Sequence, residues 1–139
     1  MSNRLIDAFG QFGATPKSRL RSRSAIAEDG ALVLSCPTPH FRHPRRGVLR
    51  YEDSLSRDPG DQAVATLLGK HLVLARDGQL PVRMIVIAAA TAGKVRYSIY
   101  ARPDVIGRVV EFDGDHYIVD FTRIIAERKQ AEGSRRRRS

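Results

Sequence analysis

A succession of strand-like segments within Leu80–Arg123 places the strongest constraint on how this chain can fold. Leu80–Ala89 is almost continuously apolar, which is typical of a strand buried on both faces in the middle of a sheet. Lys94–Arg102 instead alternates apolar and polar residues, which predicts a strand with one buried face and a basic outer face. Val105–Thr122 contains Asp113-Gly114 between two apolar runs, and this arrangement is a strong signal for a β-hairpin. Pro103 precedes this hairpin and is expected to break the chain of strands.

The segments before this stretch supply a helix and further strands. Asp61–Arg76 carries apolar residues at helical spacing, and its first residue suits an N-cap, so it predicts the helix that covers the sheet. Ala25–Cys36 predicts a hairpin, because Asp29-Gly30 separates two apolar runs and both turn residues are expected to have positive φ. Gly47–Asp53 reads as a short strand. Pro37–Arg46 contains three prolines, so we expect it to be irregular, neither helical nor paired in the sheet.

The two ends of the chain are polar and basic. Asn3 can cap a short helix over Arg4–Phe12 that Gly13 ends. Thr15–Ser24 follows, either as a flexible linker or as an edge strand with its four cations on one side. These cations are Lys17, Arg19, Arg21 and Arg23. Residues 123–132 can extend as a short helix, and residues 133–139 have no apolar side chain and are expected to be disordered.

Together these segments predict one α+β domain, which suits a chain of 139 residues that is 42% hydrophobic. We expect an antiparallel or mixed sheet of about six strands with one main helix packed on one face. A short N-terminal helix and a disordered basic C-terminal tail complete the expected fold. Residues 1–24 form the N-terminal helix and basic linker, residues 25–125 the domain, and residues 126–139 the tail.

The distribution of charge indicates the kind of partner. The net charge of +9 divides into +6 in residues 1–50, −2 in residues 51–122 and +5 in residues 123–139. Basic ends on a near-neutral domain favour binding of a polyanion, although the same charge can serve only solubility. Cys36 is the only cysteine, which excludes an internal disulfide and suits a reducing cytoplasm. The longest apolar run, Met84–Ala90, is too short to cross a bilayer, and we expect a cytoplasmic protein that binds no membrane.

Few residues form a pattern that could carry chemistry. Cys36 with His40-x-x-His43 lacks an obvious fourth ligand for zinc, so this segment is read as a solvated basic loop. Asp120 with Glu127–Lys129 resembles the carboxylate and lysine set of a nuclease, but such triplets are common in charged segments. The chain has no phosphate-binding glycine loop and no nucleophile elbow. We therefore expect no enzyme activity, no catalytic residue, no cofactor and no metal.

Three basic features remain as candidates for a binding surface. The first is a loop patch of Arg42, His43, Arg45 and Arg46. The second is the outer face of a strand, with Lys94, Arg96, Tyr100 and Arg102. The third is the tail, with Arg135, Arg136, Arg137 and Arg138. If the loop and the strand are adjacent, they make one positive surface with an aromatic side chain available, and the tail adds salt-sensitive affinity.

This surface predicts a non-enzymatic accessory protein that binds the phosphate backbone of DNA or RNA. A first alternative is a protein-interaction module that inhibits an acidic partner, a nucleic-acid-handling partner or a host-defence system. A second alternative is a small metal-dependent nuclease. The sequence leaves the type of nucleic acid and the oligomeric state open.

Two segments also resemble a group of known proteins. Ser24–Cys36 and Arg102–Tyr117 are similar to segments of uncharacterised small proteins that are carried on bacterial plasmids and integrative elements. The resemblance implies a setting of conjugation, maintenance or evasion of host defence. It implies no activity.

Overall fold

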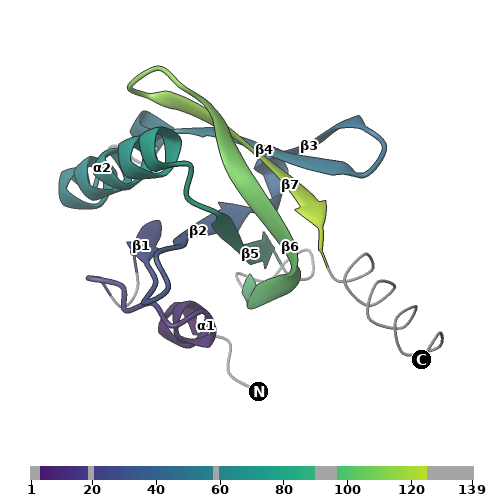
Figure 1. Cartoon of the computed structure of the whole chain (residues 1–139). Coiled ribbons are helices and arrows are strands. Elements are labelled where there is room, and N and C mark those ends of the chain that lie inside the picture. The colour runs from purple at the N-terminus through teal and green to yellow at the C-terminus, as the bar shows by residue number, and fades with distance from the viewer. Residues whose placement is uncertain (1–3, 19–20, 58–59, 90–96, 125–139) are drawn as a thin grey trace.

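The computed structural model describes residues 4–18, 21–57, 60–89 and 97–124 (Figure 1). These residues form two α-helices and seven strands of one mixed sheet, so the α+β prediction is confirmed, with one strand more than expected. The elements are α1 (Leu5–Gln11), β1 (Ser24–Ile26), β2 (Leu32–Pro37), η1 (Thr38–His40), β3 (Phe41–Arg45), β4 (Val48–Ser54), η2 (Leu55–Arg57), α2 (Gln62–Gly78), β5 (Val82–Ala89), β6 (Tyr97–Phe112) and β7 (His116–Arg123). No helix in these ranges is long and apolar enough to cross a membrane.

The strand order is β1-β2-β5-β6-β7-β4-β3, and every pair is antiparallel except β2 with β5. A parallel pair needs a long connection, and here the chain passes through β3, β4 and α2 before it returns as β5. The apolar segment that was predicted to be central is therefore central: β5 lies between β2 and β6.

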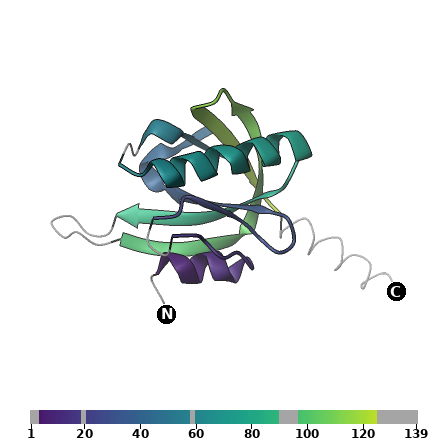
Figure 2. The same cartoon turned by 90° about the vertical axis from the view of Figure 1, so that its left-hand side faces the viewer.

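Both faces of β5 are covered, which explains its nearly continuous apolar sequence. On one face, Met84 packs in a core with Leu68 and Leu72 of α2. On the other face, Ile85 packs with Phe9 of α1. Figure 2 shows α2 and α1 on opposite sides of the strands. We call these the α2 face and the α1 face of the sheet.

Strand β6 connects the two halves of the sheet and contains the main departure from the predicted strands. It is 16 residues long, and it pairs with β5 through its first half and with β7 through its second half. Met84 lies opposite Arg102, whereas Val82 lies opposite Gly107, so extra residues bulge out of β6 between these two pairs. The expected break at Pro103 was wrong, because a bulge accepts a proline that lacks the N–H of a regular ladder.

The proline-rich segment is also more regular than expected. Residues 38–40 form the 3₁₀ helix η1, and residues 41–45 form β3, which pairs with β4 at the edge of the sheet. Pro44 falls in the register shift between Arg42 and Arg45. An edge strand with such an irregularity can include proline without losing a ladder hydrogen bond, so the prediction of an unpaired loop was wrong.

The predicted hairpin over residues 25–36 is confirmed by the antiparallel pair β1–β2, but its turn differs from the expected one. Only Gly30 has a positive φ, of +92°. Asp29 keeps a negative φ, and its Oδ1 accepts a hydrogen bond from the N–H of Ala31 at 3.0 Å. The second predicted hairpin is confirmed as β6–β7, with Gly114 at a φ of +105°.

The helices begin and end near their predicted limits. Asp61 is the N-cap of α2, and its side chain accepts a hydrogen bond from the N–H of Val64 at 3.2 Å. The helix continues to Gly78, slightly beyond the predicted end. The N-cap of α1 is Arg4, without a side-chain cap, and so the predicted capping by Asn3 was wrong. The predictions for residues 90–96 and 125–139 lie outside the described residues.

Candidate nucleic-acid interface

The predicted loop patch lies on the β3–β4 hairpin at one edge of the sheet. Arg45 is opposite Val48, so the strands are joined by Arg46 and Gly47, and Gly47 has a φ of +82° that the tight turn requires. Figure 1 shows this hairpin projecting from the body of the protein. All four residues of the patch, including Arg42 and His43, are exposed. The patch is therefore a basic two-stranded arm rather than an irregular loop.

Most of the charge on this arm is not neutralised by the protein. Within the described ranges, Arg42, Arg45 and Arg46 form no ion pair. Arg42 donates only to the backbone, to the carbonyl oxygens of Pro39 at 3.1 Å and of Phe41 at 2.9 Å. These guanidinium groups are available to an anion from outside the protein.

The neighbouring arginine on β4 behaves differently. Arg50 lies opposite Arg42, and it donates through Nε and Nη2 to the two carboxylate oxygens of Asp120 at 2.7 and 2.9 Å. This bidentate hydrogen bonding raises the pKa of Arg50 above its ordinary value. Arg50 is thus held in an internal ion pair with Asp120. Of these two opposite arginines, Arg42 is the one whose charge stays exposed.

A hollow of about 500 Å³ lies beside the arm, between the hairpin and the bulge of β6. Its wall includes His43 from β3, Arg102 from β6 and Arg123 from β7, with apolar surface from Leu49 and Phe121. The structure therefore brings one residue of the predicted loop patch, His43, and one residue of the predicted strand face, Arg102, to a single hollow. Arg123 was not among the predicted site residues, because its position at the end of a strand next to Arg102 depends on the long-range pairing of β6 and β7.

Arg102 and Tyr100 lie on a different face from the one expected. In an antiparallel pair, directly opposite residues share a face, and Arg102 is opposite Met84 of the α2 core. The two residues are thus on the α2 face and not on an outer face, so that part of the prediction was wrong. Tyr100 is nevertheless 45% exposed, beyond the part of this face that the core fills. An aromatic ring is therefore accessible beside Arg102.

Arg102 is partly neutralised. Its Nη2 lies 2.6 Å from Oδ2 of Asp104, and its Nε lies 3.1 Å from Oδ1. This hydrogen bonding raises the pKa of Arg102 and lowers the pKa of Asp104. The unpaired positive charge at the hollow comes mainly from Arg123, which forms no ion pair within the described residues.

The last described residues of the chain lie near this hollow. Arg123 ends β7, and the N–H of Ile124 donates to the carbonyl oxygen of Asp104 at 3.2 Å. Arg135 follows Ile124 by 11 residues, so it can lie at most about 40 Å away. Arg135–Arg138, with Lys94 and Arg96, lie outside the described residues, and their part in the surface stays a prediction.

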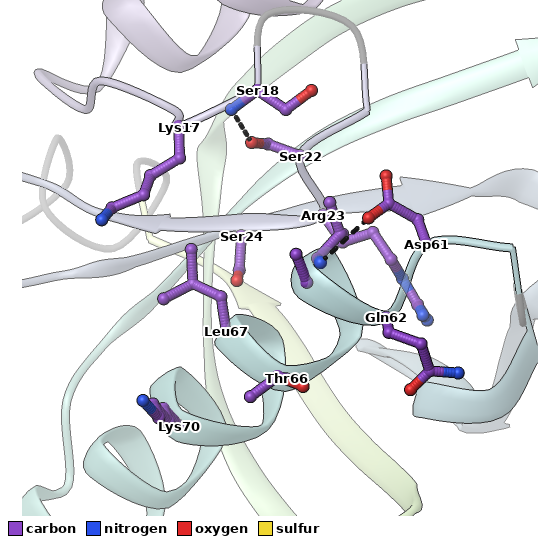
Figure 3. Close-up of a pocket in the computed structure, with 12 residues that line it drawn as sticks. Lys17, Ser18, Ser22, Arg23, Ser24, Asp61, Gln62, Thr66, Leu67 and Lys70 are labelled. Atoms are coloured by element: carbon purple, nitrogen blue, oxygen red, sulfur yellow. Dashed lines mark hydrogen bonds between the residues drawn. The ribbon is translucent and has the colours of Figure 1, made fainter.

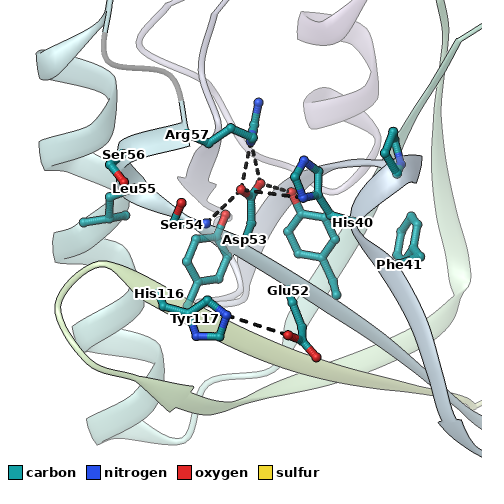
Figure 4. Close-up of polar contacts among 12 residues, drawn as sticks. His40, Phe41, Glu52, Asp53, Ser54, Leu55, Ser56, Arg57, His116 and Tyr117 are labelled. Atoms are coloured by element: carbon teal, nitrogen blue, oxygen red, sulfur yellow. Dashed lines mark hydrogen bonds and ion pairs between the residues drawn. The ribbon is translucent and has the colours of Figure 1, made fainter.

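A buried ionic cluster surrounds Asp53 (Figure 4), and the sequence did not indicate it. The cluster includes Arg23 of the basic linker. The Asp53 side chain is 1% exposed and the Arg23 side chain 7%. Arg23 donates to the carbonyl oxygens of Ser54 at 2.7 Å and Leu55 at 3.0 Å, and it lies 3.4 Å from Asp53. The expectation that all four linker cations face one way in solvent was therefore wrong for Arg23.

The remaining hydrogen-bonding capacity of Asp53 is also filled. The Nε of Arg57 lies 2.8 and 2.9 Å from its two oxygens, and the N–H of Ser54 donates at 2.8 Å. The hydroxyl of Tyr51 donates to Oδ2. Burial raises the pKa of Tyr51 well above its ordinary value, so this phenol stays a donor. A fully satisfied and inaccessible carboxylate of this kind joins η2, β4 and the linker, and it is not placed to act on a substrate.

The patterns considered for metal chemistry do not form a site in the described part of the chain. There, no group of three or more His, Cys, Asp or Glu side chains could hold a metal ion. Cys36 is fully buried, as predicted, and burial raises the pKa of its thiol well above the ordinary value. Both carboxylate oxygens of Asp120 accept hydrogen bonds from Arg50, and Glu127 lies outside the described residues.

The turn between β6 and β7 contains Asp113 and Asp115, and hydrogen bonds within the turn account for their positions. Oδ1 of Asp113 accepts hydrogen bonds from the N–H groups of Asp115 at 2.9 Å and His116 at 2.8 Å. These bonds lower the pKa of Asp113. The predicted position of Asp113 in the turn is confirmed.

Searches of protein-family models, of curated proteins and of solved structures find no match to this chain. The functional conclusion therefore depends on the geometry and charge described above.

Proposed function

We propose that this protein is a non-enzymatic accessory protein that binds nucleic acid through the β3–β4 hairpin and the hollow beside it. One observation carries the proposal: a projecting two-stranded arm presents Arg42, Arg45 and Arg46, and none of them has a carboxylate partner within the described ranges. A two-stranded ribbon fits the major groove of DNA, and unpaired guanidinium groups release counterions when they contact phosphates. The bacterial mobile-element setting belongs to the same proposal.

The kind of contact follows from the side chains. The arm offers guanidinium groups and one imidazole, which suit phosphate contacts and carry little sequence information. Tyr100 is the exposed aromatic side chain next to Arg102, so it is the candidate for stacking on an unpaired base. We propose binding that is dominated by the phosphate backbone, in DNA or RNA, with weak sequence preference.

The test is fluorescence anisotropy of labelled single-stranded and double-stranded DNA and RNA over a salt series. The variant Arg45→Gln/Arg46→Gln should lower the slope of log K against log salt by about 2, since each lost phosphate contact contributes about 0.9. The matched control is Arg4→Gln/Arg76→Gln, which removes the same charge from two exposed arginines away from the arm. Equal losses in the two variants would show that only net charge matters, and the proposed interface would be rejected.

A second comparison separates the folded domain from the tail. A version that ends at Gly133 lacks Arg135–Arg138 but keeps the hairpin and the hollow. Binding that survives this truncation, with a steep salt dependence, supports the proposed interface. Binding that disappears with the tail would assign the affinity to nonspecific charge.

One observation favours the alternative of a protein-interaction module. An apolar hollow of about 620 Å³ lies between α2 and the β6–β7 hairpin, lined in part by Leu55, Val73, Leu74 and Phe112. Val73 is 38% exposed and Leu74 54%, although both belong to the amphipathic helix. This alternative predicts capture of one stoichiometric nucleic-acid-handling protein, lost on Leu74→Asp, and no affinity for bare nucleic acid.

A further inference from the structure

A separate cavity of about 670 Å³ lies between the segment that precedes β1 and the first turns of α2 (Figure 3). The segment contributes Lys17 and Ser18, and the helix contributes Thr66, Leu67 and Lys70. Figure 3 shows Lys17 and Lys70 on the same side of the cavity, with Leu67 between them. Two lysines from distant parts of the sequence thus line one cavity.

The wall of the cavity is positive. Within the described ranges neither Lys17 nor Lys70 forms an ion pair. Among the described residues of the wall the one carboxylate is Asp61, and it is already engaged, since it caps α2 and its Oδ2 lies 3.7 Å from Nη1 of Arg21. Burial lowers the pKa of the nearby His71, and the positive charge of Lys17 lowers it further.

A buried donor in the same wall has no acceptor among the residues that the structure describes. Arg23 lines the cavity, its side chain is 7% exposed, and Figure 3 shows it running from the segment toward the start of α2. Its Nη atoms donate to carbonyl oxygens, but its buried Nε has no hydrogen-bond partner among the described residues. A buried N–H without an acceptor is unfavourable by about 1–3 kcal/mol.

We propose that this cavity binds a phosphate-bearing small molecule. Lys17 and Lys70 would neutralise the phosphate, and the serine and threonine hydroxyls of the wall would add hydrogen bonds. A volume of 670 Å³ exceeds what a single phosphate fills and falls within the usual range for ligand pockets, so an organic body packs against Val64 and Leu67. The site is distinct from the proposed nucleic-acid interface, since Figure 1 places β1 and the β3–β4 hairpin on opposite sides of the molecule.

The test is a titration of the full chain with inorganic phosphate, adenosine monophosphate and adenosine, followed by ¹⁵N NMR and calorimetry. We expect adenosine monophosphate to bind more tightly than inorganic phosphate, and adenosine not to bind. Lys17→Met/Lys70→Met should weaken binding by at least about tenfold, as expected for the loss of charge-assisted hydrogen bonds. Equal binding of adenosine and its monophosphate, or an unchanged affinity in the lysine variant, would overturn the proposal.

A second variant tests the sign of the effect. Asp61→Asn keeps an N-cap acceptor for α2 and removes the one negative charge of the wall, so the affinity should rise several-fold. The control Arg45→Gln/Arg46→Gln lies on the hairpin and should bind the small molecules like the unaltered protein. This control distinguishes the two proposals, because the hairpin variant can lose nucleic-acid binding while its affinity for the phosphate compounds stays unchanged. A lower affinity in Asp61→Asn would contradict the proposed electrostatics.

Discussion

Replacement of Asp53 by Asn should destabilise the protein strongly, although the two side chains have nearly the same shape. The carboxylate lies between Arg23 and Arg57, and it is 1% exposed. Asn keeps one acceptor oxygen for the hydroxyl of Tyr51, but it removes the negative charge that faces two guanidinium groups. The variant therefore leaves buried positive charge without compensation.

The size of the effect depends mainly on Arg23. Its side chain is 7% exposed, whereas that of Arg57 is 30% exposed and can be stabilised by water. Removal of one member of a buried ion pair costs about 3–5 kcal/mol, and we expect Asp53→Asn to fall in this range. For a domain of this size such a loss lowers the melting temperature by about 10–15 °C. Since domains of this kind have about 5–15 kcal/mol of stability, the variant should remain folded only marginally.

The assay is urea unfolding followed by circular dichroism, for Asp53→Asn, Arg23→Met and the double variant. The double variant should lose less stability than the two single losses combined, because the second change removes a charge that the first left unpaired. Asp120→Asn is the matched control, since Asp120 also binds an arginine with both oxygens but that arginine reaches solvent, and it should lose much less. A loss of under about 1 kcal/mol in Asp53→Asn would refute the view that this carboxylate compensates buried charge.

Two glycines and two titrating groups give further predictions. A Cβ at Gly107 would lie 2.7 Å from the ring of Phe121 and 2.8 Å from a backbone carbonyl of β7, so Gly107→Ala should lose about 1–3 kcal/mol in urea unfolding. Gly10→Ala is the control, because nothing lies within 4 Å of its added Cβ and an alanine in a helix gains about 0.5–1 kcal/mol. Burial raises the pKa of Cys36 and Tyr51, so these groups lose their protons at lower pH in the unfolded chain than in the folded protein. Their contribution to the free energy of unfolding should therefore be constant below about pH 8. It should fall as the pH rises past the pKa values of an unfolded thiol, about 8.5, and an unfolded phenol, about 10. Urea midpoints from neutral to alkaline pH measure this, and in Cys36→Ala the earlier part of the decline should disappear.

The parts of the fold that depend on local patterns were predictable from the sequence. The apolar run of β5, the amphipathic pattern of α2 and the two Asp-Gly hairpins each carry their own signal, and the structure confirms all of them. The proline-rich strand β3 was missed because its pairing depends on β4 as an edge partner, which no local pattern reveals. The continuous strand β6 was missed for a related reason, since a bulge that accommodates Pro103 is stabilised by neighbours on both sides.

The candidate interface was predictable only in part. The residues of the hairpin arm could be selected because His43, Arg45 and Arg46 are concentrated in one short segment. The pairing of β6 with β5 decides which face Arg102 occupies, and the pairing of β7 brings Arg123 next to it. Neither feature has a signal in the order of residues alone.

The linker arginines show why a count of charges does not identify a binding surface. Arg21 and Arg23 belong to the same alternating stretch, yet Arg21 is exposed, whereas Arg23 is buried against Asp53. An arginine becomes available to a phosphate only when no internal carboxylate neutralises its guanidinium group, and this is decided by contacts far away in sequence. On this criterion Arg45 and Arg46 are free within the described ranges, whereas Arg23 and Arg50 are not. Replacement of Arg45 or Arg46 should therefore lower the salt dependence of nucleic-acid binding, whereas replacement of Arg23 or Arg50 should not. Each replacement removes the same formal charge.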